Sequence, residues 1–171
     1  DQPKTTDSRE ITSGIEIRDS SVHNTAVEYQ GGLGIWVGYT QNTFIHNNII
    51  FDLPYTALSV GWGWGYNDPT FAGDNKVQKN IIYDFNKILY DGGGIYSLSA
   101  QPGNIYSDNF INYLESKTNQ WDYPIYLDQR SRYIEIANNV VFRATDSYAS
   151  LISGGENIIH DNYWDGNDAN H

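Results

Sequence analysis

The chain has 171 residues, no cysteine and a formal net charge of −11 at pH 7, with only 10 Lys and Arg residues scattered along it. So little basic charge argues against nucleic-acid binding, and the lack of cysteine excludes disulfides and thiolate metal sites. No apolar run is long enough to span a bilayer, so we expect no membrane partner.

One short pattern recurs along the chain around a turn residue that is usually Asn. It consists of an apolar or aromatic residue, two other residues, the Asn, and two residues that are mostly apolar. In chain order the turn residue is Ser20 in a degenerate first copy, then Asn48, Asn80, Asn109, Asn139 and Asn162. The spacings between these positions are 28, 32, 29, 30 and 23 residues. Such a period, with short strands and no helix signal, predicts a β-solenoid, because propeller blades need about 40 residues or more.

A second strand is predicted between consecutive turns. It starts with a small residue or Pro and continues with alternating apolar residues, at 34–37, 57–60, 94–97, 124–127 and 149–152. Side chains alternate between the two faces of a strand. If the isoleucines of these strands point inward, the aromatic residues that follow them, Trp36, Tyr96 and Tyr126, point outward. They would then form one wall of a groove, or a purely structural stack.

Both patterns together predict the fold. If one Asn from each coil occupies the same turn, the side-chain amides form a ladder that satisfies the backbone groups of the turn. We therefore predict an all-β fold, a right-handed parallel β-helix of about five to six coils, in a single domain over residues 1–171. Because the sequence starts at Asp1 and has no Met, either a leader has been removed or the chain is a fragment; we expect a fragment of a longer solenoid.

Two of the repeats are lengthened by insertions, at residues 61–74 and 114–123. Insertions in solenoids tend to lie on one face, which is often the binding face. Trp62 and Trp64 lie between glycines in the first insertion, where rings that stay accessible could stack on sugars. Rings that fold back onto the solenoid wall are an equally good alternative.

The clearest carboxylate is Asp91, which three glycines follow. Glycines allow a backbone to approach a ligand closely, although a turn Asp that caps its own backbone is the alternative. Asp128 ends the corresponding strand of the next repeat. If the two strands are straight, these acids lie seven positions apart, more than about 20 Å at roughly 3.3 Å per residue. Asp122 fits simple register better as the partner of Asp91.

His46 lies one coil before the glycine-rich segments and is a candidate groove residue, with an ordinary surface histidine as the alternative. None of the four histidines has a second histidine at ligand spacing, which argues against zinc. We expect no metal and no cofactor, although the abundance of Asp leaves a Ca²⁺ site open.

Residues 34–139 resemble right-handed parallel β-helix proteins of glycoside hydrolase family 141, in the pectate-lyase-like superfamily. The motifs that carry the resemblance are YTALSVGWGWG at 55–65, DGGGIY at 91–96 and IYLD at 125–128. The resemblance implies a secreted or periplasmic enzyme with two catalytic Asp residues, which the motifs place at Asp91 and Asp128.

The sequence therefore predicts a glycoside hydrolase that cleaves plant or algal polysaccharide with two Asp carboxylates. His46, Trp62, Trp64, Tyr96 and Tyr126 are the candidate substrate-binding residues. One alternative is a Ca²⁺-dependent polysaccharide lyase, for which Arg130 and Arg132 are the nearest cationic pair. Another is a non-catalytic carbohydrate-binding or adhesive solenoid. The expected partners are an oligo- or polysaccharide and the remainder of a parent chain.

Overall fold

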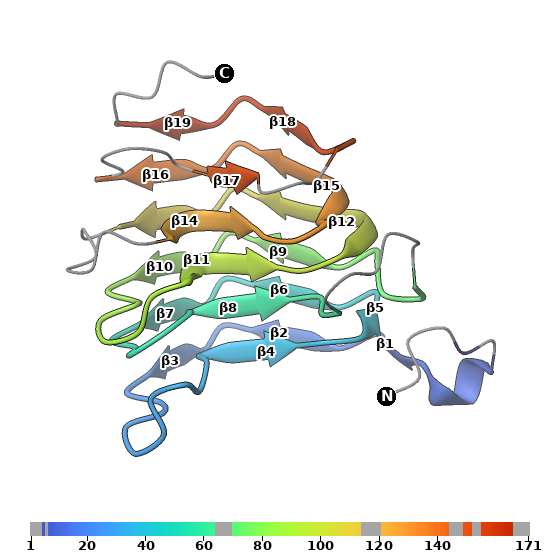
Figure 1. The fold of residues 1–171 in the computed structure, drawn as a ribbon, viewed down its shortest axis with the longest axis horizontal. Helices are drawn as coiled ribbons and strands as arrows, with labels where there is room; N and C mark the ends of the chain where they lie inside the picture. The colour runs from blue at the N-terminus through green and yellow to red at the C-terminus, as the bar shows by residue number, and fades with distance from the viewer. Residues whose placement is uncertain are drawn as a thin grey trace.

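The structure is a computed structural model that describes residues 5, 7–63, 70–113, 121–143, 149–151 and 155–165. These residues form a stack of short parallel strands, with one 3-10 helix at Ser8–Glu10 (Figure 1). The predicted all-β parallel β-helix is confirmed. No helix in the described part of the chain is long and apolar enough to cross a membrane.

Three parallel sheets make up the solenoid, named here by their positions in Figure 1. The front sheet contains β4 (Ile35–Val37), β8 (Leu58–Val60), β11 (Gly92–Ser97), β14 (Asp122–Leu127) and β17 (Ala149–Leu151). The left sheet contains β3 (Ser21–His23), β7 (Ile49–Phe51), β10 (Ile81–Tyr83), β13 (Phe110–Asn112), β16 (Val140–Phe142) and β19 (Tyr163–Trp164). The right sheet contains β2 (Glu16–Arg18), β6 (Phe44–His46), β9 (Lys76–Gln78), β12 (Ala100–Ser107), β15 (Arg132–Ala137) and β18 (Ile158–His160). A further pair, β1 (Thr12–Ser13) and β5 (Thr40–Gln41), lies beside the first coils.

The core lies inside the solenoid, where each sheet contributes at least one row of inward side chains. Ile35, Leu58, Ile95 and Ile125 form the row of the front sheet and are in register from strand to strand. All four are almost completely buried. Because side chains alternate along a strand, their neighbours in the sequence face outward, as predicted.

The predicted asparagine ladder is confirmed at the turn between the right and left sheets. The Asn48 backbone N–H donates to Asn80 Oδ1, and the Asn80 N–H donates to Asn109 Oδ1, each at 3.0 Å. The same bond joins Ser20 to Asn48 at one end and Asn139 to Asn162 at the other, at 3.1 and 2.9 Å. Each ladder residue between these two ends is therefore held by the coils on both sides of it.

The backbone of this turn explains its composition. The residue before each ladder position has a left-handed φ between 51° and 58°: Asp19, Asn47, Lys79, Asp108, Asn138 and Asp161. Asn and Asp adopt this conformation more readily than other non-glycine residues. All of these residues except Lys79 are Asn or Asp. The conformational preference of these residues therefore favours the same turn that the ladder stabilises.

A second amide ladder, which the sequence analysis missed, lies between the front and right sheets. The Thr43 N–H donates to Asn75 Oδ1 and the Asn75 N–H donates to Asn104 Oδ1, both at 2.9 Å. Asn157 accepts the same kind of bond from the Ile134 N–H at 3.0 Å. Because Thr43 and Ile134 occupy the amide position in their coils, the repeat is harder to recognise in the sequence.

Candidate active site

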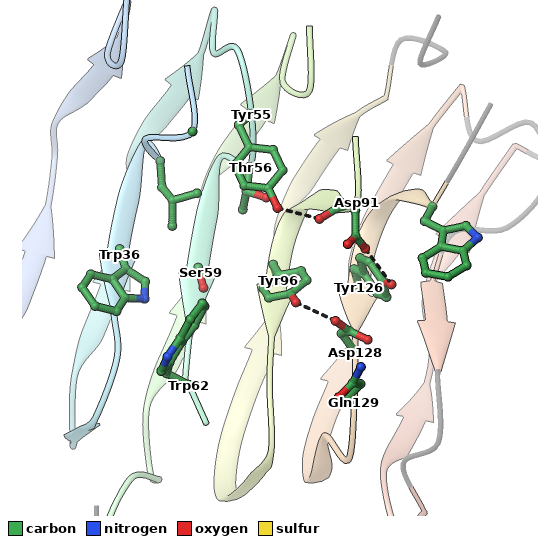
Figure 2. Close-up of a pocket in the computed structure, with 13 residues that line it drawn as sticks. Trp36, Tyr55, Thr56, Ser59, Trp62, Asp91, Tyr96, Tyr126, Asp128 and Gln129 are labelled. Atoms are coloured by element: carbon green, nitrogen blue, oxygen red, sulfur yellow. Dashed lines mark hydrogen bonds between the residues drawn. The ribbon is translucent and has the colours of Figure 1, made fainter. Parts of the chain in front are cut away.

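A cavity of about 450 Å³ opens on the outer face of the front sheet (Figure 2). Its lining comprises Gly31, Leu33, Trp36, Tyr55, Thr56, Ser59, Trp62, Asp91, Tyr96, Trp121, Tyr126, Asp128 and Gln129. Tyr96 and Tyr126 occupy paired positions on β11 and β14. They are only 8% and 1% exposed, because they pack against each other, Trp62 and Tyr123.

Asp91 immediately precedes β11 and has a left-handed φ of 63°. The Tyr55 hydroxyl donates to the Asp91 carbonyl oxygen at 2.7 Å and so holds this turn. The glycines that follow are buried against neighbouring coils. A Cβ at Gly92 would lie 2.3 Å from Thr56 Oγ1, and one at Gly94 would lie 2.7 Å from the Pro124 carbonyl oxygen. These two glycines therefore allow close packing between coils; the proposed approach to a ligand does not explain them.

Asp91 and Asp128 are each bonded to a tyrosine of the other coil. The Tyr126 hydroxyl donates to Asp91 Oδ1 at 3.2 Å, and the Tyr96 hydroxyl donates to Asp128 Oδ2 at 2.6 Å (Figure 2). The two tyrosine rings meet edge to face, with centroids 5.2 Å apart. The result is one connected group of two acids and two hydroxyls, in which Asp128 is 7% exposed.

Burial dominates the electrostatics of this group. It raises the pKa of Asp91, the hydrogen bond from Tyr126 lowers that pKa, and the negative charge of Asp128 raises it further. Burial also raises the pKa of Tyr96 and of Tyr126, and the neighbouring carboxylates add to the effect. Both hydroxyls therefore stay protonated and act as donors.

The structure brings Asp128, and not Asp122, into the cavity with Asp91. Ile95 and Ile125 are paired as expected, so the offset of Asp91 and Asp128 along the strands stands. Their side chains nevertheless approach the same tyrosine pair: Tyr126 bonds to Asp91, Tyr96 bonds to Asp128, and Figure 2 shows both acids beside the Tyr126 side chain. Asp122 pairs with Gly92 on the neighbouring strand and accepts a hydrogen bond from the Asn86 side chain at 3.0 Å.

The prediction for His46 is wrong, because this residue lies on β6 of the right sheet. Its Nε2 lies 2.9 Å from Glu16 Oε1 and its ring stacks on Phe44. The position two residues before a ladder Asn always falls on the right sheet, away from the front face. Trp62 does line the cavity, whereas Trp64 lies outside the described residues.

The sequence analysis did not single out two residues that line the cavity, Tyr55 and Trp121. Trp121 is 63% exposed, has a φ of 52°, and its carbonyl oxygen accepts a hydrogen bond from the Gly92 N–H at 3.2 Å. Trp121 could have been recognised as a candidate from its position in the second insertion, because insertions in solenoids tend to lie on the binding face.

The described residues that line this cavity include no Lys, Arg or His. Arg132 forms an ion pair with Glu156 at 2.7 Å, and it lies on β15 of the right sheet. Arg130 is exposed and is not part of the lining. Within the described ranges, no three His, Cys, Asp or Glu side chains are grouped so that they could hold a metal ion. The cationic base expected of a lyase is therefore not found at this cavity.

Comparison with known proteins gives one informative match. A solved structure named glycoside hydrolase superposes with a TM-score of 0.83 and 25% sequence identity over 95% of this chain. The chain spans 27% of the length of that structure's chain. No family model and no curated protein sequence matches. The match supports the β-solenoid fold and a link to carbohydrate-active proteins, while membership of family 141 stays a prediction.

Proposed function

We propose that these coils form the active site of a glycoside hydrolase in which Asp91 and Asp128 are the two working carboxylates. The observation that carries the proposal is their presence in one aromatic-lined cavity, each bonded to a tyrosine hydroxyl. Paired carboxyl groups are the usual machinery of glycosidic bond hydrolysis. The similarity to a structure named glycoside hydrolase supports the same class.

The environments of the two acids suggest different roles. Burial and the charge of Asp128 raise the pKa of Asp91, which suits a general acid that must hold a proton until it passes to the glycosidic oxygen. Asp128 accepts a short hydrogen bond from Tyr96, which suits an ionised carboxylate. Asp128 would then attack the anomeric carbon, or take a proton from the water that does so.

The lining of the cavity favours hydrolysis over a lyase reaction. A lyase removes a proton next to a uronate carboxylate and needs a cationic side chain or a metal to neutralise that carboxylate. Two aspartates without a lining cation would repel such a substrate. We propose a plant or algal polysaccharide as the substrate, met in a secreted or periplasmic location.

The test is the release of reducing ends from plant and algal glycans. Asp91→Asn and Asp128→Asn should each lower hydrolysis by about 100-fold or more. Asp122→Asn is the matched control, since Asp122 lies on the same sheet outside the cavity lining, and its rate should stay within a few-fold of wild type.

Three results would contradict the proposal. One is full activity in the Asp91→Asn or Asp128→Asn variant. Another is absorbance at 235 nm from an unsaturated uronate product, which would support the lyase. The third is tight glycan binding without turnover of any glycan, which would support a non-catalytic carbohydrate-binding solenoid.

A further inference from the structure

A row of outward side chains continues the cavity from the acids toward the first coils. Trp36 on β4 pairs with Ser59 on β8, Ser59 pairs with Tyr96 on β11, and Tyr96 pairs with Tyr126 on β14. All four side chains line the same cavity. The cavity therefore runs across the strands, along the axis of the solenoid, as Figure 2 shows from Trp36 to Asp128.

The strand spacing gives this row a length scale. Neighbouring strands of a sheet lie about 4.8 Å apart, so β4 lies roughly 10 Å from β11 and roughly 14 Å from β14. One strand spacing is close to the length of one sugar unit in an extended glycan chain. A glycan that lies along the row would thus place a sugar over Trp36 about two units from the sugar at Tyr96.

The Trp36 ring is packed as a platform. Its six-membered ring lies close to Gly38, where a Cβ would approach Trp36 Cζ2 to 3.1 Å. Trp62 meets it edge to face, with centroids 5.9 Å apart and an interplanar angle of 82°. Figure 2 shows the Trp36 ring face-on beside Trp62, which is seen edge-on. Despite these contacts, Trp36 remains 54% exposed.

The position between this platform and the acids is occupied by a small side chain. Ser59 is 1% exposed and lies between the larger side chains of Trp36 and Tyr96 in the row. Neighbouring side chains therefore cover this position, and Trp36 presents the more open surface of the row, at 54% exposed. An exposed aromatic ring held in place by its neighbours can accept the apolar face of a sugar.

We propose that Trp36, braced by Trp62, is a distal sugar-binding subsite for a glycan chain that lies along the solenoid axis with its cleaved bond at Asp91 and Asp128. This inference rests on the proposed function for the position of the cleaved bond. It identifies the ligand as a chain with at least three sugars on the Trp36 side of the cleaved bond, because a shorter stretch cannot reach from the acids to Trp36.

Chain-length dependence tests the subsite. Binding is measured by calorimetry in the inactive Asp91→Asn background, with cello-, xylo- and manno-oligosaccharides of two to six units as probes. Trp36→Ala should weaken binding of the longest oligosaccharide that binds by at least about tenfold. It should leave disaccharide binding within about twofold of the parent.

Two further variants separate a lost subsite from a damaged fold. Trp36→Tyr keeps a ring and should restore most of the affinity for long oligosaccharides. Phe142→Ala removes an exposed aromatic side chain from β16 of the left sheet and should change no affinity.

Each remaining outcome overturns the inference. These outcomes are equal loss at every chain length in Trp36→Ala, no loss at any length, and no binding of any of these probes by the parent. The proposed function is judged separately, by turnover in the wild-type protein. Length-dependent binding through Trp36 without turnover would leave the subsite standing and refute the hydrolase.

Discussion

Two connections of the solenoid differ in how much their length varies from coil to coil. One is the turn between the right and left sheets, and the other is the connection from the left to the front sheet. The first has two residues in successive coils, at 79–80, 108–109 and 138–139. The second varies: residues 52–57, 84–91 and 113–121 contain six, eight and nine residues. The constant turn carries the asparagine ladder, and the variable connection carries Asp91. The constant turn thus supports the stack, whereas the variable connection adds Asp91 and Trp121 to a site that also includes residues of the paired strands β11 and β14.

Hydrogen bonding explains the difference between the two regions. In the ladder the same amide bonds recur from coil to coil, so any other side chain leaves buried backbone groups without partners. In the variable connections each coil uses its own contacts. Tyr55 bonds to the Asp91 carbonyl oxygen in one place, and Asn86 bonds to Asp122 in another. These connections can therefore change without altering the wall, which is how loops on a rigid scaffold acquire function.

The largest effect is expected where the constant turn is broken. Asn80 is fully buried, accepts from the Asn48 N–H and donates to the Ile45 carbonyl oxygen. Asn80→Leu leaves the Asn48 N–H and the Ile45 carbonyl oxygen without these hydrogen bonds. It should lower the free energy of unfolding by about 3 to 5 kcal/mol. Urea unfolding followed by the near-UV circular dichroism of the aromatic residues measures the loss.

Ser20→Ala is the control at the exposed end of the same ladder. The Ser20 backbone still donates to Asn48, and only a hydroxyl bond to the Arg18 carbonyl oxygen is lost, so the cost should stay below about 1 kcal/mol. Equal losses in the two variants would show that burial of the ladder does not matter.

A smaller effect on stability and a selective effect on activity are expected in the variable connection. A Cβ at Gly92 would lie 2.3 Å from Thr56 Oγ1 and 2.8 Å from the Tyr55 ring, which holds Asp91. Gly92→Ala should cost about 1 to 3 kcal/mol of stability. It should also lower kcat/KM by about tenfold, because a shift of Asp91 disturbs the placement of the acid.

Gly155→Ala provides the matched comparison, since a Cβ there meets no atom within 4 Å. Its melting temperature and kcat/KM should match those of wild type. If Gly92→Ala kept full activity while losing stability, Tyr55 would not be needed to position Asp91, and the connection would be structural after all.

The same contrast explains how much could be predicted from the sequence. The ladder repeats with a recognisable residue type and period, so its turns and the inward and outward faces of β11 and β14 were predictable. Asp91 and Asp128 were found from motifs that resemble a known family. The second ladder was missed because Thr43 contributes only its backbone to it, without an amide.

The remaining features depend on contacts between coils, which the sequence does not show directly. The crossed bonds of Tyr96 and Tyr126 require both the register and the reach of two side chains. The error at His46 has a related cause: alternation along one strand shows that a residue points outward, but not which of three sheets bears the cavity. The raised pKa of Asp91 depends mainly on its burial, which arises only when the coils are stacked.

The smallest predicted effect concerns the proton on Asp91. The Tyr126 hydroxyl favours the charged carboxylate and lowers the pKa of Asp91, in opposition to burial. Tyr126→Phe removes that bond, so the pKa of Asp91 should rise further. If Asp91 is the general acid, it keeps its proton to higher pH, and the alkaline limb of the kcat/KM profile moves up. If Asp91 is the base, the acidic limb moves up instead, so the limb that shifts identifies the role. Tyr83→Phe, in the left-sheet stack on Phe51, should move neither limb. An unchanged profile in Tyr126→Phe would mean that this hydroxyl does not control the protonation of Asp91.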